Sequence, residues 1–516
     1  MGQPFFVAHE AKVYVENCPN WSFQIVSTAS CFVRCIKSPD EVQMKEDEGW
    51  VGNALRNRLR NSHSSDDDGN AGIPSVLVAY VSHWSADDQR LKRTSNSEHT
   101  KSERTTQLSN MANEEETTVP TNQRSSWTSF LKSIATFSGD LSSLTAPSFI
   151  LSPTSLCEFP SYWGEPHREF AAIATGKNPE ERMILTLRWF IATLKGQFTR
   201  RETQTGTEKK PLNPILGELF LGSWNSDSSK DKNSIGELRL WTEQVSHHPP
   251  VSAYCLLNAK AGVSYQGHCG QKTSFSGKSV IVKQVGHGLL RVKLPDNTIE
   301  SYLITLPKLR IEGLWMASPY IEVTENSHIQ SSSGYHTVLE FKGKGYFSGK
   351  AHSFTAKIYS QPKISSGVSP VYEVEGQWHG LSKFVKQTPK WWPGPGDKFL
   401  DQTEEKLDEI TVPDISEQGP MESRRVWKDV ADGIRSGDFE AASSAKSKLE
   451  NEQRVKRKEE LANGTPWQMS HFERVESDEE YARLAEMCGH TPPTEEAYYF
   501  KYEKEYIDEI LSKQQE

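Results

Sequence analysis

A long succession of short β-prone segments constrains the fold of this chain more than any other feature. Between Ser125 and Lys386, stretches rich in Val, Ile, Tyr and Phe alternate with Gly, Asn, Ser and Pro. The clearest are Ser279–Val285, Leu289–Leu294, Tyr302–Leu306, His336–Phe341 and Phe354–Tyr359. Close spacing with turn residues between the segments predicts an antiparallel meander. So many strands in one run favour a barrel, because closure removes unpaired edges.

Helical patterns flank part of this region. Residues 179–198 carry apolar side chains at helical spacing, and residues 438–462 form a long charged helix candidate bounded by Gly437 and Gly464. These stretches predict a mainly β fold with α additions (α+β). Residues 1–120 have the low hydrophobicity of a disordered or low-complexity extension, with a small domain as the alternative.

The composition excludes several classes of partner and site. A net charge of −9 gives no bulk attraction to nucleic acid. Seven cysteines without regular spacing favour a reducing compartment over a disulfide framework. The sequence shows no secretory signal and no apolar run of roughly 18 residues. We therefore expect a cytoplasmic, monomeric protein whose membrane contacts are peripheral.

The pair His247-His248, followed by Pro249-Pro250, is the sharpest local motif. Proline disfavours the α conformation at the preceding residue, so the pair is expected in extended or turn backbone. Neighbouring side chains of a strand point to opposite faces, which makes chelation of one metal awkward. Three interpretations stay open from the residues alone: a metal site, structural histidines at a strand end, and imidazoles that bind an anion such as phosphate.

Two further basic elements are weaker candidates. In residues 208–214, two prolines fix the backbone while Lys210 and Asn213 present a cation and an amide. On the later helix, two rows have i, i+4, i+8 spacing, and either is compatible with a plain surface salt-bridge row. The rows are Lys446, Glu450, Arg454 and Lys448, Glu452, Lys456.

Residues 126–137 form an amphipathic helix candidate. Its bulky apolar residues fall on roughly one face, and its polar face is nearly all Ser and Thr, with Lys132 as the one charge. The apolar residues are Trp127, Phe130, Leu131, Ile134 and Phe137. Such a helix responds mainly to packing defects in curved bilayers, and an ordinary helix packed on its own domain is the alternative.

No motif in the chain demands catalysis. Residues 343–349 are rich in glycine, but their spacing fits neither a dinucleotide fingerprint nor a P-loop, and we predict a hairpin turn there. We find no nucleophile elbow, His-Glu-x-x-His, kinase set or Cys-x-x-Cys pair. We expect no enzyme activity, no cofactor, no metal and no nucleic-acid partner.

Several blocks, in order, resemble the oxysterol-binding protein family. They are Glu243–Pro250, Lys209–Pro214 with Leu216–Phe220, Ile311–Gly313, Ala317–Pro319, Gly345–Gly349, and Glu422–Arg424 with Trp427, Asp429 and Val430. The eight-residue block at Glu243–Pro250 is highly specific. The resemblance covers about residues 125–475 and is greatest to short members that consist mainly of the ligand-binding domain.

The resemblance implies a near-complete antiparallel β-barrel around an apolar tunnel, with an N-terminal lid helix and a C-terminal helical segment. On this basis residues 121–400 contain the lid, the helical segment and the lipid-binding barrel. Residues 401–516 would be the helical C-terminal part of the same domain. The family carries sterol or phosphatidylinositol 4-phosphate, one at a time, and exchanges them between membranes.

The resemblance also implies a phosphoinositide headgroup site at the tunnel mouth. Its residues would be Lys210, Leu212, Asn213, His247, His248, Lys446, Glu450 and Arg454. Glu450 would orient Lys446 and Arg454 rather than meet the phosphate. The resemblance thus selects the first of the two helical rows.

The sterol end implied by the resemblance contains Trp163, Gln197 and Phe198. Close short members have a tyrosine at the position of Phe198. Loss of that hydroxyl removes one possible partner from a buried polar network, where one hydrogen bond contributes on the order of 1 kcal/mol.

We expect exchange of the two lipids through competition for one tunnel, on transient visits to membranes such as the Golgi or endoplasmic reticulum. Two alternatives remain from the sequence. One is a phosphoinositide or sterol sensor without bulk transfer. The other is a carrier of a different lipid, such as phosphatidylserine.

Overall fold

The computed structural model describes residues 12–13, 21–28, 30–37, 124–137, 139–141, 144, 146–205, 208–225, 235–247, 249–343, 350–362, 367–405, 407–489 and 497–502, with the backbone alone for those before 124 and for 201–205. The chain divides into two compact units, Met1–Thr106 and Gln107–Glu516. In the first unit, β1 (Lys12–Val13), β2 (Trp21–Thr28) and β3 (Ser30–Lys37) form an antiparallel sheet. The disorder expected for residues 1–120 as a whole stays a prediction.

The second unit is built on one fourteen-stranded sheet. Its strands are β6 (Leu219–Trp224), β7 (Leu238–His247), β8 (Pro250–Asn258), β9 (Val263–Phe275), β10 (Val280–Val285), β11 (His287–Lys293), β12 (Ile299–Thr305), β13 (Lys308–Glu312), β14 (Tyr320–Ser331), β15 (His336–Lys342), β16 (Ser353–Tyr359), β17 (Tyr372–Gln377), β18 (Leu381–Phe384) and β19 (Lys398–Asp401). The main path runs from β6 to β19, while β10 and β13 pair beside it with β9 and β14. Every pairing in this sheet is antiparallel, so the predicted meander is confirmed.

Helices and short strands complete the unit. The helices are α3 (Arg124–Thr136), α4 (Ser161–Gly164), α5 (His167–Ala172), α6 (Pro179–Thr205), α7 (Ser423–Val426), α8 (Lys428–Ser436), α9 (Phe439–Ala462) and α10 (Glu479–Cys488). The short 3-10 helices are η3 (Ser148–Ile150), η4 (Leu156–Glu158), η5 (Ile173–Thr175) and η6 (Leu314–Met316). The remaining strands are β4 (Leu151–Ser155), β5 (Lys210–Leu212), β20 (Phe472–Val475) and β21 (Ala497–Phe500). The predicted fold class, mainly β with helical additions, is confirmed.

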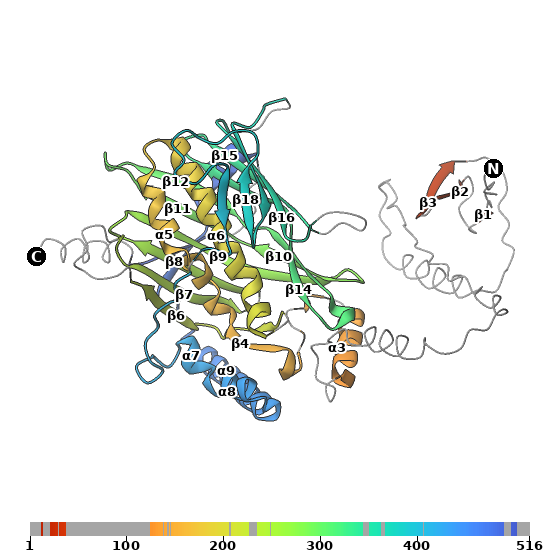
Figure 1. The fold of residues 1–516 in the computed structure, drawn as a ribbon. Helices are drawn as coiled ribbons and strands as arrows, with labels where there is room; N and C mark the ends of the chain where they lie inside the picture. Colours follow the sequence, from red (N-terminus) through yellow and green to blue (C-terminus); the bar gives the residue numbers. More distant parts are fainter. Residues whose placement is uncertain are drawn as a thin grey trace, which may run out of the picture. The chain divides into compact units, whose positions relative to one another are not determined.

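Figure 1 shows the sheet curving around α6, which contacts β14, β15 and the edge strand β19. The middle of the helix is buried or half-buried throughout residues 181–199, and Leu187, Trp189 and Phe190 are fully buried in the main core. This part of α6 therefore lies inside the protein rather than on its surface. The helix predicted for residues 179–198 is therefore confirmed, and it continues to Thr205.

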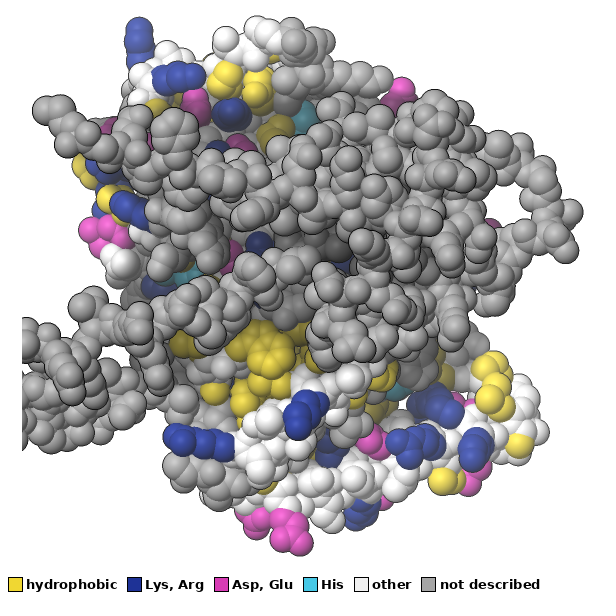
Figure 2. Space-filling model, turned by 90° about the vertical axis from the view of Figure 1, so that its right-hand side faces the viewer, with side chains coloured by type: hydrophobic (Ala, Val, Ile, Leu, Met, Phe, Trp, Pro, Cys, Tyr) yellow, Lys and Arg dark blue, Asp and Glu magenta, His cyan; other side chains and the backbone are white. Residues whose placement is uncertain are grey.

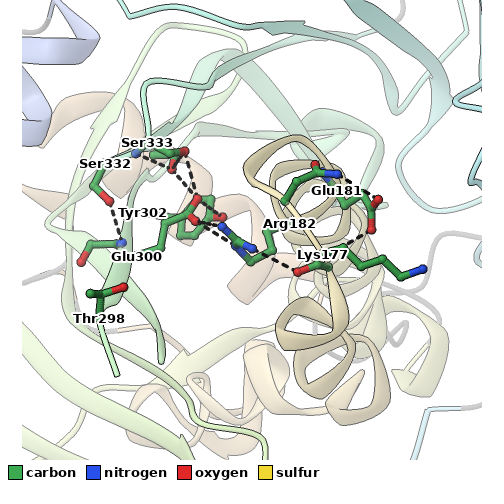
Figure 3. Close-up of polar contacts among 12 residues, drawn as sticks. Lys177, Glu181, Arg182, Thr298, Glu300, Tyr302, Ser332 and Ser333 are labelled. Atoms are coloured by element: carbon green, nitrogen blue, oxygen red, sulfur yellow. Dashed lines mark hydrogen bonds and ion pairs between the residues drawn. The ribbon is translucent and has the colours of Figure 1, made fainter. Parts of the chain in front are cut away.

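A buried polar network fixes the first turn of α6 (Figure 3). Asn178 Oδ1 accepts the N–H of Glu181 at 3.0 Å, which caps the helix. One turn in, Arg182 Nε donates to Glu300 Oε2 at 2.8 Å, and Tyr302 OH donates to the other oxygen of Glu300 at 2.7 Å. A buried ion pair is tolerated only when further hydrogen bonds satisfy it. This network thus sets how α6 lies against β12.

Candidate functional site

The second unit encloses a cavity of about 240 Å³. Its lining is mostly apolar and comes from α3, from the segment before α6, and from the inner face of the sheet. Representative lining residues are Trp127, Phe130, Ile134, Tyr162, Tyr254, Val282 and Leu309. Figure 2 shows hydrophobic side chains gathered in a hollow on this face, with Lys and Arg side chains below and beside them. A concave apolar site with a few convergent polar groups suits a small amphipathic ligand.

The helix α3 covers this cavity with the residues predicted for the lid. Trp127, Leu131 and Ile134 are buried, Phe130 lines the cavity, and Phe137, just past the helix, is 38% exposed. The apolar face of the helix therefore lies against its own domain. The role of these five residues in sensing membranes stays a prediction.

Hydroxyl groups on the other face of α3 bond within the helix. Thr128, Ser129 and Ser133 each donate to a backbone carbonyl four residues earlier, at 3.0 Å. Beyond the helix, Asp140 Oδ1 accepts the N–H of Thr273 on β9 at 3.0 Å and its hydroxyl at 2.7 Å. The segment after α3 is thereby attached to the sheet.

One part of the cavity wall is basic, as predicted. Lys209, Lys210 and Asn213 all line it. The Lys210 ammonium donates to the Leu144 carbonyl at 2.8 Å, and Lys209 donates to the Phe149 carbonyl at 3.1 Å. Both lysines are thus held by neutral backbone oxygens, and the carboxylate of Asp140 offsets part of the charge of Lys210.

Lys446 of α9 belongs with Lys209 and Lys210, because its charge acts on Lys210. Burial, and next the positive charge of Lys446, lower the pKa of Lys210 to about 8. A buried ammonium whose protonation is disfavoured by a neighbouring positive charge marks a site that favours an anion. Lys446 is ion-paired with Glu450, whose second oxygen lies 3.8 Å from Arg454. The predicted row of α9 therefore exists as a contiguous set, and Arg454 is its most exposed member, at 67%.

His247 lies at the end of β7, beside the loop that follows Lys210. Its Nδ1 is 3.1 Å from the Pro214 carbonyl oxygen, a contact that needs the proton on Nδ1. The ring is therefore oriented by the Lys-Pro-Leu-Asn-Pro block. His248 lies outside the described residues. We name Lys209, Lys210, Asn213, His247 and Lys446 the basic cluster.

Leu212 is placed differently from the other predicted headgroup residues. Its side chain is 1% exposed and packs in a separate core group with Ile215, Trp427 and Val430. It does not line the cavity. Its side chain anchors the block to α8, so any contact with a headgroup would fall to its backbone.

The predicted sterol residues lie on the aromatic part of the wall, and all three line the cavity. The Trp163 ring packs 5.1 Å from that of Tyr265, and Phe198 lies edge-on to Trp378 at 6.1 Å. Gln197 Nε2 donates to Thr193 Oγ1 at 2.8 Å. We name Trp163, Gln197, Phe198 and Tyr254 the aromatic wall. One cavity thus brings together residues predicted for both ligand classes.

Two buried carboxylates position the site, and sequence reasoning assigned neither a role. Glu218 accepts the N–H of Ile215 at 3.0 Å and the Trp427 indole N–H at 2.8 Å, so it ties the Lys-Pro-Leu-Asn-Pro block to α8. Glu243 accepts the N–H groups of Ser470 at 2.7 Å and His471 at 2.8 Å. Both acids lie inside the sequence blocks Leu216–Phe220 and Glu243–Pro250 singled out above, and this position was the one sequence signal that could have identified them.

Gln244 and Ser252 are further polar lining residues that the sequence did not single out. Ser252 Oγ donates to Gln244 Oε1 at 2.5 Å across β7 and β8. Of the glycine-rich segment 343–349, predicted as a hairpin turn, residues 344–349 lie outside the described residues. No helix in the described part of the chain is both long and apolar enough to cross a bilayer.

An apolar cavity covered by a helix, inside an antiparallel sheet, is typical of a protein that binds a small apolar molecule. Residues 126–433 match the family model described as oxysterol-binding protein. Protein KES1 of Mycosarcoma maydis is 57% identical over 384 residues, covering 74% of this chain and 97% of that protein. Protein kes1 of Schizosaccharomyces pombe is 47% identical over 380 residues, covering 73% and 94%. The chain belongs to the oxysterol-binding protein family.

Solved structures share the fold. The Osh1 ORD domain in complex with cholesterol matches with a TM-score of 0.56 at 20% identity, over 74% of this chain and 88% of that chain. The Osh3 ORD of Saccharomyces cerevisiae in complex with PI(4)P matches with a TM-score of 0.51 at 22% identity, over 75% and 92%. At these identities the likeness establishes the architecture.

Proposed function

We propose that this protein binds phosphatidylinositol 4-phosphate and sterol alternately in the cavity and exchanges them between membranes. The observation that carries the proposal is that Lys209, Lys210 and Asn213 of the basic cluster line the same apolar cavity beneath α3 as the aromatic wall. A single cavity admits one ligand at a time. Competition for it would couple the two lipid fluxes.

The relatives support both ligand classes. Structures of the same fold hold cholesterol, ergosterol and PI(4)P. The phosphate would meet Lys210, Asn213, His247 and Lys446 through charge-assisted hydrogen bonds, which are roughly twice as strong as neutral ones. A sterol hydroxyl offers one neutral partner and would rely on Gln197 and on shape.

The apolar cavity would replace the bilayer around the lipid body. Each methylene group exposed to water costs about 0.8 kcal/mol, so an uncovered lipid would not leave its membrane. The helix α3 would provide the cover while the protein is between membranes. The cycle makes and breaks no covalent bond, and we place it in the cytoplasm, with transient visits to membranes such as the Golgi and endoplasmic reticulum.

Transfer between liposomes tests the proposal. Donor vesicles would hold fluorescent sterol, acceptor vesicles would hold phosphatidylinositol 4-phosphate, and the protein would be present at a hundredth of the lipid concentration. We expect several turnovers per protein molecule, faster with the phosphoinositide in the acceptor. Extraction limited to one lipid per protein would favour a sensor, and transfer of phosphatidylserine alone would favour a different carrier.

Mass spectrometry of the recovered lipids tests the absence of chemistry. We expect both lipids to keep their masses after many cycles. A dephosphorylated or hydrolysed product that depends on the protein would contradict the proposal.

A further inference from the structure

A second cluster of ligating side chains lies at the docking site of α10. His328 is on β14, His336 begins β15, and Cys488 ends α10. The donor atoms of all three lie within 4.8 Å of one another. His336 is 1% exposed, Cys488 is also buried, and His328 is partly buried.

Packing of α10 on the sheet brings the cluster together. Tyr481, Leu484 and Ala485 of the helix form a core group with Leu289 of β11 and Leu303 of β12. This contact holds the last turn of α10 against β14. The sulfur of Cys488 is then 3.5 Å from Nε2 of His336, across 152 residues of sequence.

The spacing of the donor atoms fits a tetrahedral zinc ion. Zinc bonds of about 2.0–2.1 Å to nitrogen and 2.3 Å to sulfur place ligand atoms about 3.3 Å (N to N) and 3.6 Å (N to S) apart at tetrahedral angles. In the cluster, His328 Nδ1 lies 3.1 Å from His336 Nε2, which lies 3.5 Å from the sulfur. Both distances match a shared ion within a few tenths of an ångström.

A hydrogen bond explains only one of the two close contacts of His336 Nε2 at a time. A neutral imidazole nitrogen carries either one lone pair or one hydrogen. The Nε2 atom of His336, however, faces both the His328 nitrogen and the Cys488 sulfur. One ion at the centre would accept a lone pair from each of the three atoms at once.

We propose that His328, His336 and Cys488 bind one Zn²⁺ ion, with water or a further ligand in the fourth position. Two neutral imidazoles and a thiolate suit this borderline-soft cation. The sequence predicts no metal, because its one histidine motif, His247-His248, lacks a third ligand. The ion would fasten α10 to β14 and β15, a structural role separate from the lipid cavity.

Metal titration of the full chain after treatment with a chelator tests the site. Co²⁺ added to the protein should give the ultraviolet thiolate-to-metal charge-transfer absorption and the visible bands of a tetrahedral complex. Zn²⁺ should then displace the cobalt. We expect Cys488→Ser to bind one equivalent less than the wild type and to lose the charge-transfer band at this site.

The matched control is Cys255→Ala, which removes a buried thiol from the core group on β8 and should keep both the equivalent and the band. If Cys488→Ser fails to fold, His328→Gln takes its place, because His328 is the least buried ligand. That variant should bind Zn²⁺ at least tenfold more weakly, with an unchanged melting temperature of the metal-free protein.

Thermal unfolding gives an independent measurement. An ion that binds only the folded state raises the melting temperature. Zn²⁺ should raise that of the wild type by several degrees and leave that of Cys488→Ser unchanged. Equal zinc stoichiometry in the wild type, Cys488→Ser and His328→Gln would overturn the proposal and leave a hydrogen-bonded cluster only.

Discussion

Part of the basic cluster (Lys209, Lys210 and Asn213) lines the same cavity as the aromatic wall, but the two groups are held in place by different interactions. Lys209 and Lys210 are held by backbone carbonyls, and Lys446 is held by one carboxylate, so the cluster keeps excess positive charge. In the aromatic wall, rings pack on rings, and Gln197 supplies the polar side chain at the position predicted for the sterol hydroxyl.

The difference indicates how each ligand would be selected. Charge-assisted contacts in the basic cluster are strong and distinguish a phosphate from a hydroxyl. Aromatic packing is less specific and distinguishes ligands by shape. Changes in the cluster should therefore have larger and more selective effects than changes in the wall.

The largest effect is expected from Lys210→Ala. The lysine lines the cavity, and burial, and next the charge of Lys446, lower its pKa to about 8. A hydrogen bond to a charged group contributes about 1.5–3 kcal/mol, so phosphatidylinositol 4-phosphate should bind about 10- to 100-fold more weakly. Sterol affinity should stay within about twofold. Titration with fluorescent lipids measures both, and equal losses for the two ligands would mean that the cluster and the wall are not separate.

A pH titration should give the next largest effect. Because the folded-state pKa of Lys210 is lowered to about 8, its ammonium is present below that pH and is lost as pH rises through it. The phosphate is already almost fully ionised there, since its second pKa is about 6. Phosphoinositide affinity should thus fall by up to about tenfold between pH 7 and pH 9. Lys210→Arg should flatten this profile, because arginine keeps its charge, and an unchanged slope would exclude Lys210 as its source.

A smaller effect on phosphoinositide affinity is expected from α9, where either of two rows of charged residues could bind the headgroup. Lys446→Ala should weaken phosphoinositide binding about three- to tenfold, because the Lys446 ammonium adds positive charge close to Lys210. Lys448→Ala, from the other row, is the matched control and should leave binding unchanged. Equilibrium binding at two salt concentrations would separate the rows, and equal losses in the two variants would indicate a nonspecific charge effect.

The smallest effect is expected from Phe198→Tyr in the aromatic wall. One added hydroxyl offers one neutral hydrogen bond, about 1 kcal/mol, so sterol affinity should rise about fivefold. Phosphoinositide affinity should not change, which makes it the internal control. Sterol binding that is absent before and after the substitution would show that the wall serves another lipid.

Much of the fold could be predicted because its signals are local. The apolar spacing of residues 179–198 predicted α6, and the stretch 438–462 bounded by Gly437 and Gly464 predicted α9. The ends of both helices differ from expectation by a few residues at most, apart from the extension of α6. The turn between β11 and β12 was equally local, with Asn297 at positive φ and Asp296 accepting from Thr298. Periodicity and turn chemistry are sufficient for such elements.

The remainder depends on contacts between distant residues. The pair β20–β21 joins two four-residue segments separated by α10, and nothing in either segment indicates the other. Likewise, nothing in the sequence around Glu243 indicates that it is fully buried and holds residues 470–472. The approach of Lys446 to Lys210 has no local signal either.

In the proposed transfer cycle, the hydroxyls of α3 bear on how the cavity would open. Because Thr128, Ser129 and Ser133 bond within the helix, α3 can leave the cavity without breaking these three bonds. In that cycle the main resistance to opening would be the apolar area exposed to water, and a loosely packed bilayer would cover that same area. Because Asp140 attaches the segment after α3 to β9, the helix would turn about this attachment and move its apolar face from the cavity to the bilayer. Opening would then be favourable only at a membrane.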